Sequence, residues 1–426
     1  MLSYRKLAMR VLGRPLHTGG SDSPRPASQR AAALILTAAM LTTLTAPAFA
    51  KEWYIEEGDI TVRAGETEGT NKVSQGENPE VEDTNTVITN SDKDKASSNT
   101  VTIEAENEDD KVEVTLKDVN IDTSSRSEAA VSVTGEGNTN IELDGDNALK
   151  SDIYSSGISS SGSLTISGGE NDSLTAQGGS GADGIYSSGS LTISGGTVTA
   201  NGGSGGGGDG GDGIWSSGGV TISGGSTVTA NGGNGGNVSG DGIRSDSGDV
   251  TISGGTVKAA GGDSKDGYGG DGIRSGGVTI SGGTVNAAGG NGGKVGGYGI
   301  CSFARVAISG GTVNAAGGNG KNSNGGSDGI ISNDIDLSGS LELTAKAGRP
   351  NGKAISWAGH ELDLDTIKDK LGPGAKVTAT DANGETKQVS SPIPRPVEPE
   401  EPEPVIPEES SSSSDGGSAA PSAPAS

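Results

Sequence analysis

Short segments in the middle of the chain alternate apolar and polar residues. One copy of the pattern is GIYSSGSLTISGGTVTANGG, residues 184–203. A period of two is typical of β-strands that bury one face, and glycines between such segments are typical of turns. The unit therefore predicts three short strands separated by turns. One set of apolar side chains is expected to face inward, namely Ile185, Leu191, Ile193, Val198 and Ala200.

The same unit recurs along the chain. The string ISGG begins at Ile166, Ile193, Ile222, Ile252, Ile280 and Ile308, at intervals of 27 to 30 residues. The pair Gly-Ile recurs in phase with it, starting at Gly157, Gly184, Gly213, Gly242, Gly272, Gly299 and Gly329. Stacked repeats bury a continuous core that one repeat alone cannot form. We therefore predict an all-β fold, a right-handed parallel β-helix with coils of about 28 residues and three short strands per coil.

The pattern divides the chain into five regions. We expect a signal peptide over 1–50, an acidic lead-in or irregular first coil over 51–99, and the β-helix over 100–345. A C-terminal cap is expected over 346–389, and a disordered tail rich in Pro, Glu and Ser over 390–426. A short helix carrying Leu364, Ile367 and Leu371 on one face is expected to close the last coil.

The leader predicts export. Basic residues precede an apolar run from Ala31 to Leu44, and the run ends at Ala48-Phe49-Ala50, small residues of the kind that a signal peptidase recognises. The apolar run is shorter than the ~20 residues that span a membrane. We expect a secreted protein, extracellular or held at the cell surface.

Composition excludes several classes of protein. Glycine accounts for 77 of the 426 residues and apolar types for 30 %, too few for a large conventional core. The net charge of −25 argues against nucleic acid as a partner. The single cysteine, Cys301, excludes a disulfide framework within the chain. The position of Cys301 in the repeat predicts an exposed free thiol.

The residue after each Gly-Ile forms a row across the coils, and alternation points it outward. This outer row consists of Ser159, Tyr186, Trp215, Arg244, Arg274, Cys301 and Ile331. Aromatic rings stack on sugar rings, and guanidinium groups bind carboxylates through two parallel hydrogen bonds. Tyr186, Trp215, Arg244 and Arg274 are therefore the candidate carbohydrate-binding residues, suited to an acidic glycan. The alternative is an ordinary exposed strand, where such residues are common.

Aspartate precedes Gly-Ile in most coils, at Asp183, Asp212, Asp241, Asp271 and Asp328. Two interpretations remain open. Asp-Gly is a common turn sequence. Stacked carboxylates also repel one another, and bound calcium would relieve that repulsion. Asp183, Asp212, Asp241 and Asp271 are thus candidate ligands of a structural calcium ion.

The segments VEVTLKDVNID, AAVSV, NIELDGDNAL and GISSSGSLTISGG together resemble one family. They are similar to the bacterial carbohydrate-binding β-helix proteins, secreted or surface-displayed polysaccharide binders related in fold to pectate lyases. The resemblance covers roughly residues 100–365 and implies binding of cellulose or pectin-like acidic polysaccharide, with structural calcium. The loops here are much richer in glycine, and no calcium-ligand set carries over.

Three functions are compatible with these features. The preferred prediction is a polysaccharide-binding protein without enzymatic activity. A structural stalk or adhesin for other cell-surface partners is the first alternative, and a calcium-dependent polysaccharide lyase is the second. A lyase needs a base and a cation, for which Arg244 or Arg274 with Asp241 and Asp271 is the candidate set. These residues lie in monotonous repeats without the asymmetry of an active site.

Overall fold

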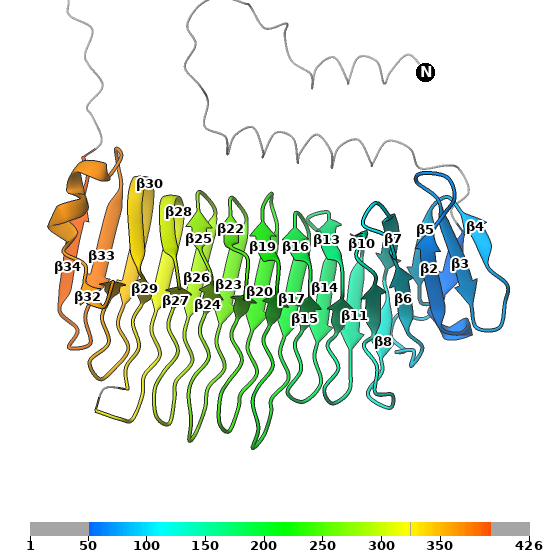
Figure 1. The fold of residues 1–426 in the computed structure, drawn as a ribbon, viewed down its shortest axis with the longest axis horizontal. Helices are drawn as coiled ribbons and strands as arrows, with labels where there is room; N and C mark the ends of the chain where they lie inside the picture. The colour runs from blue at the N-terminus through cyan, green and yellow to red at the C-terminus, as the bar shows by residue number, and fades with distance from the viewer. Residues whose placement is uncertain (1–50, 324, 393–426) are drawn as a thin grey trace, which may run out of the picture.

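The computed structural model describes residues 51–323 and 325–392. They form a parallel β-helix whose strands stack in rows along one long axis, with loops projecting along one side (Figure 1). The fold predicted from the repeat is confirmed. The expected signal peptide and most of the expected tail lie outside the described residues.

Most coils contribute three strands to two sheets. In one coil these are β15 (Ile185–Ser187), β16 (Ser190–Ile193) and β17 (Thr197–Asn201). Strands equivalent to β15 form sheet B, and strands equivalent to β16 and β17 form two rows that are joined as sheet A. The rows join because the last coils carry single long strands that run through both rows.

Sheet B has 14 strands. They are β2 (Ile60–Ala64), β3 (Asn71–Gln75), β4 (Val81–Asp83), β6 (Val101–Glu104), β9 (Val131–Thr134), β12 (Ile158–Ser160), β15, β18 (Ile214–Ser216), β21 (Ile243–Ser245), β24 (Ile273–Ser275), β27 (Ile300–Ser302), β29 (Ile330–Ser332), β31 (Ile355–Trp357) and β32 (His360–Glu361).

Sheet A has 20 strands. They are β1 (Glu52–Tyr54), β5 (Thr86–Thr89), β7 (Lys111–Lys117), β8 (Asn120–Asp122), β10 (Asn138–Asp144), β11 (Asp146–Lys150), β13 (Ser163–Gly168), β14 (Ser173–Gln177), β16, β17, β19 (Gly219–Ile222), β20 (Thr227–Asn231), β22 (Val250–Ile252), β23 (Thr256–Ala260), β25 (Val278–Ile280), β26 (Thr284–Ala288), β28 (Arg305–Ala316), β30 (Asp334–Lys346), β33 (Lys376–Thr380) and β34 (Thr386–Ser390).

The core consists of apolar side chains stacked on their equivalents in the next coil. Ile185 pairs with Ile214, and Leu191 pairs with Val220. The inward set predicted from alternation is confirmed, because every member of it is fully buried. A repeat length that varies only in the loops keeps the strands in register, so each core residue meets a similar one.

Both ends of the solenoid are closed by antiparallel strands. At the first end, β2, β3 and β4 pair antiparallel, while β2 also pairs in parallel with β6. At the last end, β33 and β34 form an antiparallel pair. The helix expected there is a 3-10 helix, η2 (Leu364–Lys370), which buries Leu364 and Ile367, while a second 3-10 helix, η1 (Ile55–Glu57), follows β1. These caps cover edges on which further strands would otherwise pair.

The glycine-rich loops between β17-type and β15-type strands consist of two arms that bond to each other from coil to coil. Gly203 N donates to Ala182 O at 2.7 Å, and Gly211 N donates to Gly203 O at 2.9 Å. Gly233 N then donates to Gly211 O at 2.7 Å, and the alternation continues through later coils. A Cβ added at Gly203 would overlap the backbone oxygen of Gly179. Glycine is therefore required here because two backbones approach without room for a side chain.

Candidate functional site

The outer row lies on sheet B in the register that the repeat predicts. Tyr186 pairs with Trp215, Trp215 with Arg244, and Arg244 with Arg274. The next pairings along the row join Arg274 to Cys301 and Cys301 to Ile331. The structure therefore brings the four candidate carbohydrate-binding residues together as direct neighbours in four successive coils. We call Tyr186, Trp215, Arg244 and Arg274 the binding strip.

The first half of the binding strip is an aromatic and cationic cluster. The ring centroids of Tyr186 and Trp215 are 5.1 Å apart, with an interplanar angle of 72°. The guanidinium carbon of Arg244 lies 4.9 Å from the centroid of the Trp215 ring. Both distances are within the range of favourable edge-to-face and cation–π contacts. These contacts fix the rings and the guanidinium group relative to one another.

Asp246, which follows β21, holds Trp215 and Arg244 in place through hydrogen bonds. Its two carboxylate oxygens accept hydrogen bonds from Trp215 Nε1 at 3.0 Å and from Arg244 Nε at 2.8 Å. Arg244 Nη1 also lies 3.8 Å from Asp212 Oδ2. Part of the Arg244 charge is therefore balanced inside the protein. Asp246 is a site residue that the repeat pattern did not single out, because it lies two positions after the outer row.

Arg274 is less constrained by neighbouring carboxylates than Arg244 and is therefore freer to bind an anion. Within the described residues its one ion pair is with Asp271, where Nη1 and Oδ2 are 3.7 Å apart, longer than a hydrogen bond. Its side chain is 43 % exposed, and its guanidinium carbon lies 5.2 Å from the centroid of the Phe303 ring. A planar guanidinium with unused donors is suited to a carboxylate. Arg274 is thus the member of the strip whose guanidinium group is best placed to bind an anion.

The aspartates before Gly-Ile are buried and bond to the backbone of the next coil. The Oδ1 atom of Asp183 accepts from Asp212 N at 2.7 Å, and that of Asp212 accepts from Asp241 N at 2.5 Å. Asp241 and Asp271 continue the row, accepting from Asp271 N and Tyr298 N, each at 2.6 Å. Each side chain therefore satisfies a backbone donor where the chain leaves a loop and enters sheet B. We call these four residues the aspartate row.

Burial changes the acidity of the aspartate row. Burial raises the pKa of Asp183 to about 6, against the lowering effect of the Asp212 backbone N–H. Burial and the neighbouring Asp241 carboxylate raise the pKa of Asp271 to about 8. The pKa values of Asp212 and Asp241 are also raised, with burial as the main cause. Part of this row therefore carries protons near neutral pH.

The aspartate row does not resemble a calcium shell. Calcium takes six to eight oxygen ligands, whereas each of these carboxylates is buried and uses one oxygen on the backbone. Across residues 51–323 and 325–392, no group of three or more His, Cys, Asp or Glu side chains is arranged to hold a metal ion. The calcium site at Asp183, Asp212, Asp241 and Asp271 stays a prediction.

The expected exposure of Cys301 is wrong. Its side chain is buried, with 7 % exposed, and burial raises the pKa of the thiol to about 12. The physical reason is the size of its neighbours in the outer row. Cys301 pairs with Arg274 on one side and with Ile331 on the other, and both side chains are longer. A small side chain between two long ones is covered even on an outward position.

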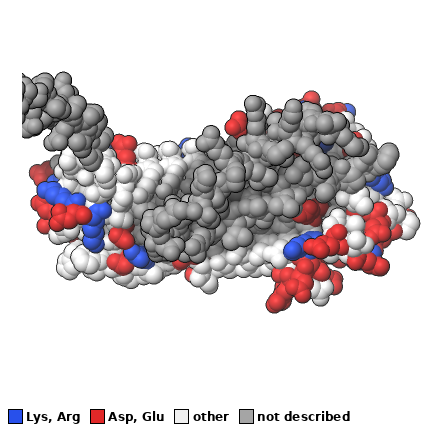
Figure 2. All heavy atoms as spheres, turned by 90° about the horizontal axis from the view of Figure 1, so that it is seen from above, with Lys and Arg blue, Asp and Glu red and all other residues white. Residues whose placement is uncertain are grey.

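The end of the solenoid formed by the first coils is rich in acidic residues. Figure 2 shows Asp and Glu side chains at both ends of the solenoid, with the larger groups at the end formed by the first coils. One segment there, residues 104–110, contains Glu104, Glu106, Glu108, Asp109 and Asp110. The strip lies on β15, β18, β21 and β24, in the middle coils of the solenoid (Figure 1). If the binding strip takes an anionic polymer, the acidic first coils would repel that polymer.

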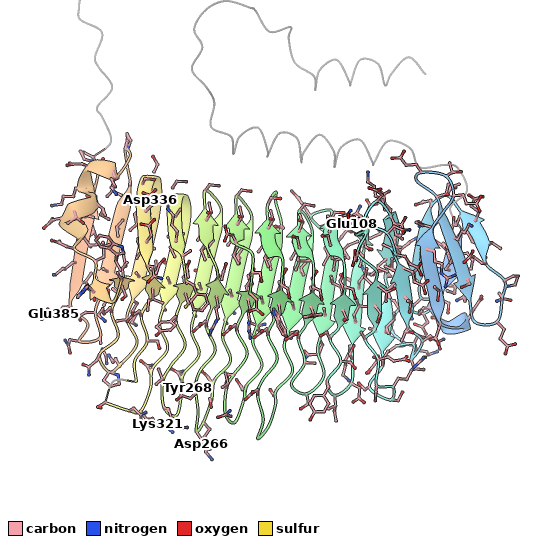
Figure 3. All side chains as sticks on the ribbon, viewed as in Figure 1. Glu108, Asp266, Tyr268, Lys321, Asp336 and Glu385 are labelled. Atoms are coloured by element: carbon pink, nitrogen blue, oxygen red, sulfur yellow. The ribbon has the colours of Figure 1, made fainter. Side chains whose placement is uncertain are left out.

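A depression lies among the loop tips, away from the binding strip. Its volume is about 840 Å³, and glycines, Asn234, Asp263, Lys265 and Lys294 are among its lining residues. Figure 3 shows Asp266, Tyr268 and Lys321 on these projecting loops, away from the sheets. The named lining side chains are solvent-exposed, and the lining contains no aromatic ring. The binding strip is therefore the better candidate site.

Comparison with known proteins supports the fold. The family model described as "Beta helix repeat" matches residues 191–214, 250–273 and 278–300. Each match runs from a β16-type strand to the β15-type strand of the following coil. No curated protein and no solved structure matches the chain. Among the described helical segments, none has the length and apolar character needed to cross a bilayer.

Proposed function

We propose that this protein binds an acidic polysaccharide through the outer face of sheet B and acts outside the cell. The observation that carries the proposal is the direct adjacency of Trp215, Arg244 and Arg274 in three successive coils. An aromatic ring provides a face for a sugar, and the guanidinium groups provide donors for its carboxylate. The leader expected over residues 1–50 supports the location.

The geometry of the strip suits a polymer with a regular repeat. Neighbouring strands in a sheet lie about 4.8 Å apart, close to the length of one pyranose unit in an extended chain. One sugar can therefore face Trp215 while the carboxylate of a uronate two units further along the chain lies over Arg274. The contacts with Tyr186 and Asp246 hold Trp215 and Arg244 in place before ligand binds. Such preorganisation lowers the entropic cost of binding.

The positions of the carboxylates favour binding without cleavage. A lyase base must reach the proton that it removes. Asp241 and Asp271, the candidates for that role, are 6 % and 5 % exposed, and each accepts a backbone hydrogen bond. A polymer lying over Arg274 would be separated from them by the guanidinium and the loop backbone. This supports the proposal of a binding protein rather than an enzyme.

The test is retention of the chain from residue 51 onward on pectate gel, compared with a neutral gel such as cellulose. We expect retention on pectate without release of unsaturated sugars, and a strong loss of retention for Arg274→Ala and Trp215→Ala. Tyr154→Ala is the matched control, because Tyr154 is an aromatic residue that is 85 % exposed and lies outside sheet B. Equal retention of all variants would refute the site, and release of unsaturated products would establish a lyase. No retention on any glycan would favour the stalk or adhesin.

A further inference from the structure

Two exposed aromatic residues lie beyond the binding strip. The chain contains three Trp and two Phe, and the described ones are Trp53, Trp215, Trp357 and Phe303. Trp53 is buried, but Phe303 is 56 % exposed and Trp357 is 50 % exposed. Large apolar groups exposed together on a soluble protein mark an interaction site more often than a packing requirement. Both of these residues follow or end strands of sheet B.

Phe303 continues the surface of the strip. It comes directly after β27, which ends at Ser302, and its exposed ring lies on the same side of sheet B as the guanidinium group of Arg274. The equivalent position in the preceding coil is Gly276, which has no side chain, and Phe303 N bonds to Ser275 O at 3.1 Å. The ring can therefore approach Arg274, whose guanidinium carbon is 5.2 Å from its centroid. Arg274 thus lies between aromatic groups of earlier and later coils.

Trp357 extends this surface by two more coils. Asn333 Nδ2 donates to Phe303 O at 2.6 Å, and Trp357 Nε1 donates to Asn333 O at 3.0 Å. Strand β31 pairs Trp357 with Ser332, whose side chain faces inward. The indole of Trp357, however, is half exposed, and its Nε1 atom contacts the backbone of the preceding coil at Asn333. Phe303, Asn333 and Trp357 therefore follow one another along the same edge of sheet B.

We propose that the carbohydrate-binding surface continues from Arg274 over Phe303 to Trp357, so that the glycan lies parallel to the axis of the solenoid. This inference rests on the proposed function. Six strand pairings separate the coil of Tyr186 from that of Trp357. At about 4.8 Å per strand the surface is about 29 Å long, enough for about six or seven sugars.

The order of side chains along this surface specifies the class of ligand. Aromatic residues lie at both ends, at Tyr186 and Trp215 and at Phe303 and Trp357, and the two arginines lie between them. A ligand that uses the whole surface needs carboxylates in its middle and accessible sugar faces at its ends. A long uronate polymer meets both requirements. A short acidic oligosaccharide meets only the first.

The test is calorimetric titration with oligogalacturonates of two to eight units, using the chain from residue 51 onward. We expect affinity to increase until the oligomer reaches about six or seven units, because each added sugar meets another coil. Phe303→Ala and Trp357→Ala should each weaken binding of the longest oligomer by roughly fivefold and leave the trimer unchanged. Phe303→Tyr should retain binding, since it keeps the ring. Tyr268→Ala, an exposed aromatic on a loop, is the control.

The outcomes separate the two proposals. If trimer and octamer bind equally well and Phe303→Ala has no effect, the lengthwise surface is refuted while the binding strip stands. If Phe303→Ala weakens trimer and octamer alike, Phe303 acts only beside Arg274 and the extension to Trp357 is refuted. If no oligomer or polymer binds, the proposed function itself fails.

Discussion

Replacing one member of the aspartate row by asparagine should make the protein more stable at neutral pH. Asp183 is 8 % exposed, and its Oδ1 atom accepts a hydrogen bond from Asp212 N at 2.7 Å. Asparagine has the same shape and keeps an oxygen acceptor for that bond. The substitution Asp183→Asn therefore removes the charge and leaves the hydrogen bond in place.

The magnitude follows from the raised pKa of Asp183. Burial raises this pKa from 3.8 to about 6, so the folded protein binds the proton more tightly than the unfolded chain. The stability from that proton is fully present below about pH 3.8 and is lost as the pH rises through 6. At 1.36 kcal/mol per pKa unit, a shift of about two units corresponds to about 3 kcal/mol. The Asp183→Asn variant does not lose this stability as the pH rises, because an amide does not titrate.

The assay is urea unfolding of wild type and Asp183→Asn between pH 3.5 and 8, followed by circular dichroism. We expect the stability of the variant relative to wild type to increase by about 3 kcal/mol from the lowest to the highest pH. Most of the increase should fall between pH 4 and 6. Equal pH dependence of the two proteins would refute the argument that burial raises the pKa of Asp183.

Asp59→Asn is a control for which the expected change in stability at neutral pH has the opposite sign. Burial of Asp59 raises its pKa, but hydrogen bonds from Arg126 and from Thr100 N lower it more, so the net pKa is below the ordinary value. The stabilisation by this carboxylate is present above the unfolded pKa and lost as the pH falls through the folded one. Asp59→Asn should therefore be less stable than wild type at pH 7, and the difference should vanish in acid.

The remaining predictions concern the loops, the core and the thiol. Gly203→Ala should lower the melting temperature strongly, because the added Cβ would overlap the backbone oxygen of Gly179. Gly207→Ala is the control, and its melting temperature should equal that of wild type because no atom lies within 4 Å of the added Cβ. Ile193→Ala should reduce the free energy of unfolding by about 2–5 kcal/mol in urea titrations, since Ile193 is fully buried. Cys301 should react with a thiol reagent at pH 8 only after unfolding, because burial raises its pKa to about 12, and rapid labelling of the folded protein would contradict its position. Retention on pectate should fall as salt is added, because arginine–carboxylate attraction is screened.

The amino-acid sequence by itself determined the coil, its register and its inward face. Alternation with a period of two assigns each residue of a strand to one of two faces, and the constant spacing of Gly-Ile and ISGG aligns equivalent residues in neighbouring coils. The pairing of Trp215 with Arg244 follows from these two patterns alone. Both patterns are visible in the order of residues along the chain, so the tertiary structure was not needed to find them.

Only the tertiary structure decided how residues in different coils affect one another. Asp183 finds its hydrogen-bond partner 29 residues away, and that bond lies in a buried place that no local pattern indicates. Cys301 is covered because its neighbours on adjacent coils are longer. Phe303 reaches Arg274 because the equivalent position in the coil of Arg274 is Gly276, which has no side chain. Exposure and acidity depend on what the coils above and below place beside a residue. Repeat periodicity specifies which positions are neighbours, and side-chain size and packing then determine their chemistry.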